Sequence, residues 1–315
     1  MENFQLILTD SLAKTKSVLG KFDPDKIRVA YSGGSDSDTT MFLVREAGFN
    51  IKGVFYDTGI EWDATKRHID YMREQGFEID TIRAVRPVPT SNRVFGHPFI
   101  NKRVSDYLER LQRHNFDFQN HGSLTFDELY SLYPKSKAAL RWWCNDWGNG
   151  SMFNIERNTY LKEFLIEYGL PFKVSGKCCD GAKKLPIKNY AKTNNIDLMI
   201  LGIRKSEGGA RASAYKSCYY PKKRYSYAMH FPMFFWNNEM KSWYDETFNI
   251  QHSDCYTEYG LSRTGCAGCP FGMNFDNELN QLQTWEPKLA KGIESIFKPT
   301  YEWTRLYRQY QDKQK

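Results

Sequence analysis

The chain has no long apolar run, no internal repeat and no low-complexity tract. No segment approaches the ~18 consecutive apolar residues of a membrane helix, so a membrane-spanning protein is not expected. The N-terminal residues 1–5 lack the basic region and the long apolar stretch of a secretory signal. We therefore expect a cytoplasmic protein with no membrane partner.

Common motifs for phosphates and metals are also missing. The Gly-Lys-Ser/Thr of the Walker loop and the Gly-x-Gly-x-x-Gly of dinucleotide folds do not occur. The six histidines show no metal-site spacing and are assigned no role. The seven cysteines, an odd number that includes the adjacent pair Cys178 and Cys179, do not suit a disulfide framework. In a cytoplasmic protein we expect thiols or metal ligands instead.

The composition is that of a folded chain with a mildly basic surface. The hydrophobic fraction is 41% and the aromatic fraction 16%, whereas disordered chains are poor in aromatic residues. The 315 residues are enough for one large α/β domain with insertions or for two smaller ones. The net charge of +7 suits an anionic partner, either nucleotide phosphates or nucleic acid. A basic surface with no polymer partner remains the alternative.

Apolar runs alternate with helical patterns, which predicts an α/β fold with a parallel sheet. The expected strands are 27–31, 51–56, 78–83 and 196–202. The expected helices are 3–20, 38–47, 63–75, 154–168 and 186–194. The stretch 84–150 interrupts the alternation and is interpreted as an insertion or lid. These patterns predict an N-terminal helix in 1–24, a nucleotide-binding domain in 25–230 and a C-terminal extension in 231–315.

The segment 32–37 reads Ser-Gly-Gly-Ser-Asp-Ser and joins an apolar strand to a helix. Glycines let the backbone approach a phosphate closely, and a helix N-terminus offers unpaired N–H groups and the positive end of a dipole. The serines add hydroxyl donors. The segment therefore predicts a phosphate site, with an ordinary capped turn as the alternative.

Two further segments directly follow predicted strands. Because the carboxyl ends of parallel strands meet at one edge of a sheet, we expect these segments at the same edge as 32–37. Asp57 and Thr58 follow the second strand, where an ordinary turn is the alternative. Arg204 and Arg211 follow the strand at 196–202 and offer forked donors for phosphates, although either one alone would be a solvated charge.

Cysteines form the second motif. Cys266 and Cys269 make a C-x-x-C followed by proline, and Cys178 and Cys179 precede them in the chain. Four soft thiolates suit zinc or an iron–sulfur cluster, and a single C-x-x-C also occurs in redox sites.

These motifs together resemble the PAPS reductase family within the PP-loop adenine-nucleotide α-hydrolases, also called N-type ATP pyrophosphatases. The resemblance is carried by Ser-Gly-Gly-x-Asp-Ser at 32–37, by 54–61, by 201–211 and by the C-terminal runs 232–243 and 256–271. It implies a five-stranded parallel sheet with helices on both faces and a nucleotide at the carboxyl ends of its strands. The implied nucleotide-binding residues are Ser32, Gly33, Gly34, Ser35, Asp36, Ser37, Asp57, Thr58, Gly202 and Arg204. The implied catalytic residues are Asp36, Arg204 and Arg211.

The paired cysteines are similar to those of the APS reductases that carry a 4Fe-4S cluster. That resemblance implies a cluster bound by Cys178, Cys179, Cys266 and Cys269. Cys144, Cys218 and Cys255 are interpreted as small buried residues, with a sulfur-relay thiol as the alternative.

Two departures from the reductases indicate another activity. The last cysteine is Cys269, so the nucleophilic cysteine of the reductase tail is missing, and 32–37 is close to the full PP-loop that goes with ATP cleavage. We therefore expect an ATP- and Mg²⁺-dependent enzyme that releases pyrophosphate and adenylates a substrate for sulfur transfer. The expected partners are DNA or tRNA and a cysteine desulfurase or other sulfur donor, and the Lys/Arg/Tyr-rich stretch 215–227 could hold the polynucleotide or be a solvated basic loop. The alternatives are an APS or PAPS reductase with an unusual thiol and a non-catalytic nucleotide-binding subunit.

Overall fold

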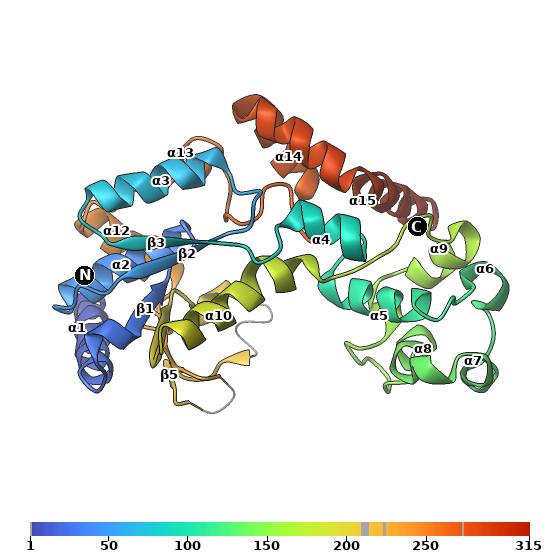
Figure 1. Ribbon diagram of the computed structural model, residues 1–315, viewed down its shortest axis with the longest axis horizontal. Helices are drawn as coiled ribbons and strands as arrows, with labels where there is room; N and C mark the ends of the chain where they lie inside the picture. The colour runs from blue at the N-terminus through green and yellow to red at the C-terminus, as the bar shows by residue number, and fades with distance from the viewer. Residues whose placement is uncertain (1, 209–213, 223–224, 273) are drawn as a thin grey trace. The chain divides into compact units, whose positions relative to one another are not determined.

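The computed structural model describes residues 2–208, 214–222, 225–272 and 274–315 (Figure 1). They form two compact units, each made from two separate stretches of chain. Unit 1 comprises Met1–Val85 and Ala182–Ala267, and unit 2 comprises Arg86–Gly181 and Gly268–Lys315. Among the described residues, no helix combines the length and the apolar character needed to cross a membrane.

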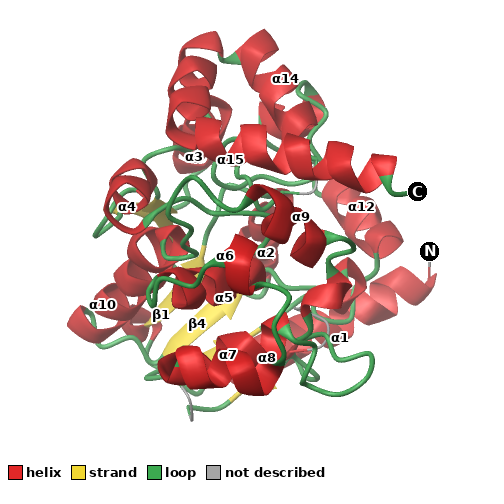
Figure 2. Cartoon of the chain, turned by 90° about the vertical axis from the view of Figure 1, so that its right-hand side faces the viewer, coloured by secondary structure: helices red, strands yellow, loops and turns green. Residues whose placement is uncertain are grey.

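The described residues of unit 1 form a six-stranded sheet in the order β3-β2-β1-β4-β6-β5. The strands are β1 Ile27–Ala30, β2 Gly53–Asp57, β3 Ile79–Arg83, β4 Leu198–Leu201, β5 Tyr219–Tyr220 and β6 Ala228–His230. All neighbouring strands are parallel except β5, which pairs antiparallel with β6. Strands β1 and β4 lie side by side in the middle of this sheet (Figure 2).

Helices cover both faces of the sheet. They are α1 Glu2–Leu19, α2 Ser35–Glu46, α3 Asp63–Glu74, α10 Leu185–Thr193, α12 Asn238–Thr247 and α13 Asp254–Thr257. Because successive strand side chains point to opposite faces, Phe55 and Ile200 join the buried cluster with α2 and α3, whereas Val54 and Met199 pack with α10. Both faces are apolar, as expected for a parallel sheet.

Unit 2 is helical. Its helices are α4 Val88–Phe95, α5 Lys102–Gln112, α6 Phe118–His121, α7 Phe126–Leu132, α8 Lys137–Trp143, α9 Leu161–Tyr168, α14 Phe275–Trp285 and α15 Pro287–Lys313. The fully buried Trp142, Trp143 and Phe164 anchor its core, and Tyr307 of α15 packs into the same cluster. Aromatic residues of 84–150 therefore pack with residues of 155–174 and of α15 in one core.

The α/β prediction is confirmed. The four expected strands are present, and β6 supplies the fifth parallel strand. The short strands β5 and β6 were not expected, and the helix predicted over 154–168 begins at Leu161, after a 3₁₀ turn at Ile155–Arg157. The predicted domain boundaries follow motifs, whereas the two units follow packing, so those boundaries stay predictions.

Candidate nucleotide site

The candidate site lies where β1, β2 and β4 end. From β1 the chain continues to β2 and β3 on one side of the sheet, while β4 and β6 occupy the other side. The carboxyl ends of β1 and β4 therefore form a topological switch point, which is where open α/β sheets bind ligands. The segments 32–37, 57–58 and 202–204 follow β1, β2 and β4, so the chain brings three of the predicted motifs to this edge.

The loop 32–37 needs its glycine and its last serine for its shape. Gly33 has a φ of +68°, and a Cβ there would come within 2.6 Å of Thr65 Cγ2. The hydroxyl of Ser37 donates to the carbonyl of Gly34 at 2.6 Å and accepts from the backbone N–H of Gly34 at 3.1 Å. Ser37 thus closes the loop, while Ser32 is exposed and Ser35 begins the 12-residue helix α2. The result is a glycine-rich turn at a helix N-terminus, a combination whose N–H groups and dipole favour an anion.

A segment from later in the chain lies beside the loop 32–37. Tyr256 Oη accepts from the backbone N–H of Thr264 at 3.2 Å and lies 3.2 Å from Thr264 Oγ1. A Cβ on Gly34 would come within 3.0 Å of Tyr256 Oη and 3.2 Å of Thr264 Oγ1. A side chain at position 34 would therefore be tightly packed, and two hydroxyl groups lie beside the loop.

Two predicted catalytic residues form one ion pair, with Arg204 buried and Asp36 half-buried. Arg204 Nε donates to Asp36 Oδ1 at 2.9 Å, and Arg204 Nη1 donates to Asn238 Oδ1 at 2.8 Å. Burial raises the pKa of Asp36, and the charge and hydrogen bond of Arg204 oppose that rise. The close approach depends on Gly202, because a Cβ there would lie 2.5 Å from the Asp36 carbonyl oxygen. Asp36, Gly202 and Arg204 are thus brought together.

The turn after β2 links a predicted nucleotide residue to a predicted cluster cysteine. Thr58 is fully buried, and its hydroxyl donates to Glu61 Oε1 at 2.6 Å. Cys266 Sγ lies 3.4 Å from Thr58 Oγ1, and Cys266 pairs with Glu61 in an antiparallel bridge. Burial raises the pKa of Glu61, opposed by Lys183. Asp57 caps its own turn through a 2.8 Å bond from the Gly59 N–H.

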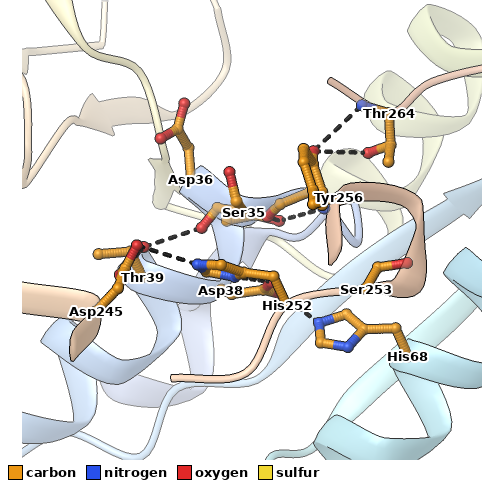
Figure 3. A network of polar contacts seen from close by, with 12 residues as sticks. Ser35, Asp36, Asp38, Thr39, His68, Asp245, His252, Ser253, Tyr256 and Thr264 are labelled. Carbon is orange, nitrogen blue, oxygen red and sulfur yellow. Dashed lines mark hydrogen bonds and ion pairs between the residues drawn. The ribbon is translucent and has the colours of Figure 1, made fainter. Parts of the chain in front are cut away.

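A network of ion pairs and hydrogen bonds lies next to the loop, around Asp38 of α2 and His252 (Figure 3). Asp38 Oδ2 lies 2.9 Å from His252 Nδ1, and His252 Nε2 lies 3.0 Å from Asp245 Oδ2. His68 Nε2 approaches Asp38 Oδ1 to 3.0 Å, and the Tyr31 hydroxyl donates to the same oxygen at 2.7 Å. Asp36 points away from this network (Figure 3).

The network favours the charged forms of Asp38, Asp245 and His252. Burial alone would raise the pKa of Asp38, but hydrogen bonds from His252 and His68 outweigh it, and the pKa is lowered. Burial likewise works against the charged ring of His252, yet Asp245 and Asp38 raise its pKa to about 9. For Asp245, the bond from His252 and the charge of Lys241 outweigh burial, and the pKa is again lowered.

Cysteines do not form a ready metal site in the part of the chain that the structure describes. No group of three or more His, Cys, Asp or Glu side chains there is arranged to hold one metal ion. Cys266 belongs to unit 1, whereas Cys178, Cys179 and Cys269 belong to unit 2. All seven cysteines are described, and none is in a disulfide. The four thiols therefore fit a cluster as donors, while their gathering into a cluster site stays a prediction.

The other candidates are less informative. Arg211 lies outside the described residues. Cys255 is fully buried, burial raises the pKa of Cys144, and Cys218 lines a pocket of about 320 Å³ beside α1. In the stretch 215–227, Tyr215 and Tyr220 pack against Phe231, so part of its aromatic content serves the core.

Sequence reasoning missed several residues of this site. They are Tyr31, Asp38, His68, Lys241, Asp245, His252, Tyr256 and Thr264. The role of the histidines could not be recognised from the sequence, because their partners are distant in the chain. His252 and Asp38, for example, are 214 positions apart. An acidic residue directly after the loop at a buried helical position was the one available hint, since such a charge needs partners.

No protein-family profile and no curated protein matches the chain. Solved structures do resemble it. A phosphoadenylyl-sulfate (PAPS) reductase from Candida auris has 10% sequence identity and a TM-score of 0.41, over 81% of this chain and 93% of that chain. The U34-tRNA thiolase NcsA from Methanococcus maripaludis, solved with its 4Fe-4S cluster, has 13% identity and a TM-score of 0.40, over 96% and 80%.

An NH3-dependent NAD synthetase from Campylobacter jejuni subsp. jejuni NCTC 11168 has 11% identity and a TM-score of 0.37, over 95% of this chain and 96% of that chain. At TM-scores below 0.5 these likenesses transfer no ligand or activity to this chain. One of these solved structures is a PAPS reductase, the kind of protein that the sequence motifs resemble.

Proposed function

We propose that this chain is a PP-loop enzyme that cleaves ATP to AMP and pyrophosphate, and so adenylates an oxygen of its substrate. The observation that carries the proposal is the loop 32–37, with its positive-φ glycine and its closing Ser37, at the switch point of a parallel sheet. Backbone N–H groups and a helix dipole at such a place favour phosphate oxygens. Asp57 and Thr58, at the end of the adjacent strand β2, would face the adenosine.

In the proposed reaction a substrate oxygen attacks the α-phosphorus and the bond to the β-phosphate breaks. Pyrophosphate leaves with the electrons of the broken bond, the attacking oxygen of the substrate keeps the AMP group, and any proton that the substrate loses passes to solvent. The chain's part is positioning and electrostatics: the loop holds the leaving phosphates, and Arg204, oriented by Asp36, offers positive charge to them together with Mg²⁺ and Arg211. A sulfur nucleophile then displaces AMP.

We propose that the adenylated substrate is nucleic acid, in a DNA phosphorothioation or tRNA thiolation type of reaction, with a cysteine desulfurase or another sulfur donor as partner. The net charge of +7 supports an anionic substrate. A 4Fe-4S cluster on Cys178, Cys179, Cys266 and Cys269 would supply sulfur chemistry when bound. Support for it is the donor chemistry of these cysteines and the position of Cys266 beside Thr58.

A sulfonucleotide reductase is the second candidate, because one thiol lies near the predicted nucleotide residues. That thiol is Cys266, 3.4 Å from the Thr58 hydroxyl. The substitute thiols expected from the sequence are Cys144, Cys218 and Cys255. Two of them have weaker support, since Cys255 is fully buried and burial raises the pKa of Cys144. A thiolate is the attacking form of cysteine, so a raised pKa opposes that role.

Three substrates separate the candidates. The iron-reconstituted protein is incubated without oxygen with ATP and Mg²⁺, with APS, or with PAPS, and pyrophosphate and sulfite are measured. Pyrophosphate from ATP supports the proposal, and sulfite from APS or PAPS with a thiol reductant supports the reductase. ATP binding without either product would identify a non-catalytic nucleotide-binding subunit.

A further inference from the structure

We infer that His252 is a positioning residue of the loop 32–37: held as an imidazolium between Asp38 and Asp245, it fixes the first turn of α2. The inference rests on the proposed function only for the identity of what the loop binds. The fixing of α2 itself is a property of the described residues of unit 1.

The imidazole of His252 bridges two elements that are far apart in the chain. Its Nδ1 lies 2.9 Å from Asp38 on α2, and its Nε2 lies 3.0 Å from Asp245 on α12 (Figure 3). Asp245 also accepts from the Thr39 hydroxyl at 2.7 Å. Residues 38 and 39, both in the first turn and a half of α2, are thus tied to α12 and to the chain just after it.

Both ring nitrogens must carry protons for this arrangement to hold. An ionised carboxylate is an acceptor only, and a neutral imidazole has one donor and one acceptor. With a carboxylate at each nitrogen, a neutral ring would turn a lone pair toward one of them. Asp38 is completely buried, so a lost donor there could not be replaced by solvent without rearrangement. The geometry therefore calls for the imidazolium.

Charges around the ring nearly cancel. Asp38 and Asp245 are balanced by His252 and by Lys241, which pairs with Asp245. The titratable groups that face the ring or its two carboxylates are Tyr31, Asp38, His68, Lys241, Asp245 and Tyr256. Removal of the ring proton would leave the carboxylates of Asp38 and Asp245 with the cation of Lys241, which pairs with Asp245. The pKa of about 9 for His252 agrees with this balance.

The link from this network to the loop is short. Asp38 follows Ser37 directly, and Ser37 closes the loop on Gly34. A shift of the first turn of α2 would therefore move the Ser37 hydroxyl and the N–H groups offered to a phosphate. We expect loss of the imidazolium to loosen this turn before it affects the rest of unit 1.

Histidine NMR in the full chain tests the charge of the ring. The His252 ring signal is expected to titrate near pH 9, and Asp245→Asn is expected to move that midpoint downward. His230 is the internal reference, because it is buried and its pKa is lowered to about 4. Its ring nitrogens face the Thr15 hydroxyl and the Cys218 carbonyl rather than carboxylates. Titration of His252 at its ordinary value of about 6.5 would overturn the inference.

Hydrogen exchange tests the positioning, with His252→Gln compared with His230→Gln at the same pH. In His252→Gln the amides of residues 34–41 are expected to exchange at least about tenfold faster, with those of α10 unchanged. His230→Gln should leave residues 34–41 as in the wild type. Unchanged exchange in His252→Gln, or equal acceleration in both variants, would overturn the inference.

Nucleotide binding then separates this inference from the proposed function. The probe is α,β-methylene-ATP, which cannot be cleaved between its α- and β-phosphates. We expect the wild-type Kd to rise about tenfold from pH 7.5 to 10, and the Kd of His252→Gln to be raised already at pH 7.5 and flat with pH. If wild type does not bind the probe, the proposed function fails, while the titration and exchange results still decide the role of His252.

Discussion

At the scale of single residues, the pairing of Asp36 with Arg204 changes how their roles are understood. The sequence indicates two separate catalytic candidates, whereas the structure joins them in one ion pair whose side chains are 23% and 9% exposed. Asn238 and Ser206 accept further bonds from the same guanidinium. A guanidinium held at several points is pre-organised, which is the property needed to stabilise charge on a leaving group.

Arg204→Lys should lower kcat for pyrophosphate release by about 10²-fold to 10³-fold, because a lysine cannot bond Asp36 and Asn238 together as the planar fork does. Steady-state kinetics with ATP and Mg²⁺ measure the effect. Lys205→Gln removes a neighbouring exposed charge and should leave kcat nearly unchanged. Equal losses in the two variants would mean that only general charge matters.

The ionic network predicts a pH dependence of stability. The folded pKa of His252, about 9, exceeds its ordinary value of 6.5, so its contribution is complete below about pH 6.5 and disappears as the pH rises through about 9. Asp38 and Asp245 have lowered pKa values, so their contributions are lost only at acid pH, below the ordinary 3.8. From pH 6 to 10 the wild type should lose up to about 3 kcal/mol of unfolding free energy relative to His252→Gln. Urea unfolding of both proteins measures it, and parallel curves would contradict the assignment.

At the scale of elements, the sheet is largely predictable and its last strands are not. Strands β1, β2 and β4 are mainly apolar runs bounded by turns or helical patterns, which is the signal of a buried strand. The edge strand β3 instead alternates apolar and polar residues, which is the signal of a half-buried strand. Strand β6 is Ala228–His230, three residues without such a run, and it exists because it pairs with β4. Its His230 is buried against Thr15 of α1, 215 positions away, and a local pattern cannot show that contact.

The chain directly after strand β4 approaches helix α2 so closely that position 202 requires a glycine. Gly202→Ala would place a Cβ 2.5 Å from the Asp36 carbonyl oxygen, with the neighbouring Thr40 hydroxyl at 2.8 Å. We expect a loss of about 1–3 kcal/mol in unfolding free energy and weaker nucleotide binding, because backbone rather than a flexible side chain must move.

The control for this change is Gly292→Ala in α15, where a Cβ meets nothing within 4 Å. That variant should gain up to about 1 kcal/mol, since alanine favours a helix over glycine. Calorimetric Tm values of both variants decide the matter. A Gly202→Ala variant as stable as the wild type would mean that the approach of β4 to α2 is not tight.

At the scale of the whole molecule, the chain crosses between its two units three times. Sequence motifs locate the loop 32–37, the β2 turn and Arg204, because each is a local pattern at a strand end. The network around His252 could not be predicted, because it joins residues from four separate segments near 38, 68, 245 and 252. Burial of a charge depends on tertiary partners, and no single-sequence pattern encodes them.

The cysteines provide a prediction at this scale. Replacement of Cys178, Cys179, Cys266 or Cys269 by alanine should each remove most of the iron bound after anaerobic reconstitution, since a cluster needs all of its thiolate ligands. Cys144→Ala should keep the iron content of the wild type. Iron per protein and the visible absorption of the cluster are measured side by side. Equal iron in all five variants would contradict the cluster assignment.

ATP cleavage is the activity that we propose for the loop 32–37. Its most direct test is pyrophosphate release from ATP by the full chain under anaerobic conditions, with and without Mg²⁺, beside the variant Asp36→Asn. We expect Mg²⁺-dependent pyrophosphate from the wild type and a loss of about 10²-fold in the variant. Sulfite from APS or PAPS, with no pyrophosphate from ATP, would contradict it.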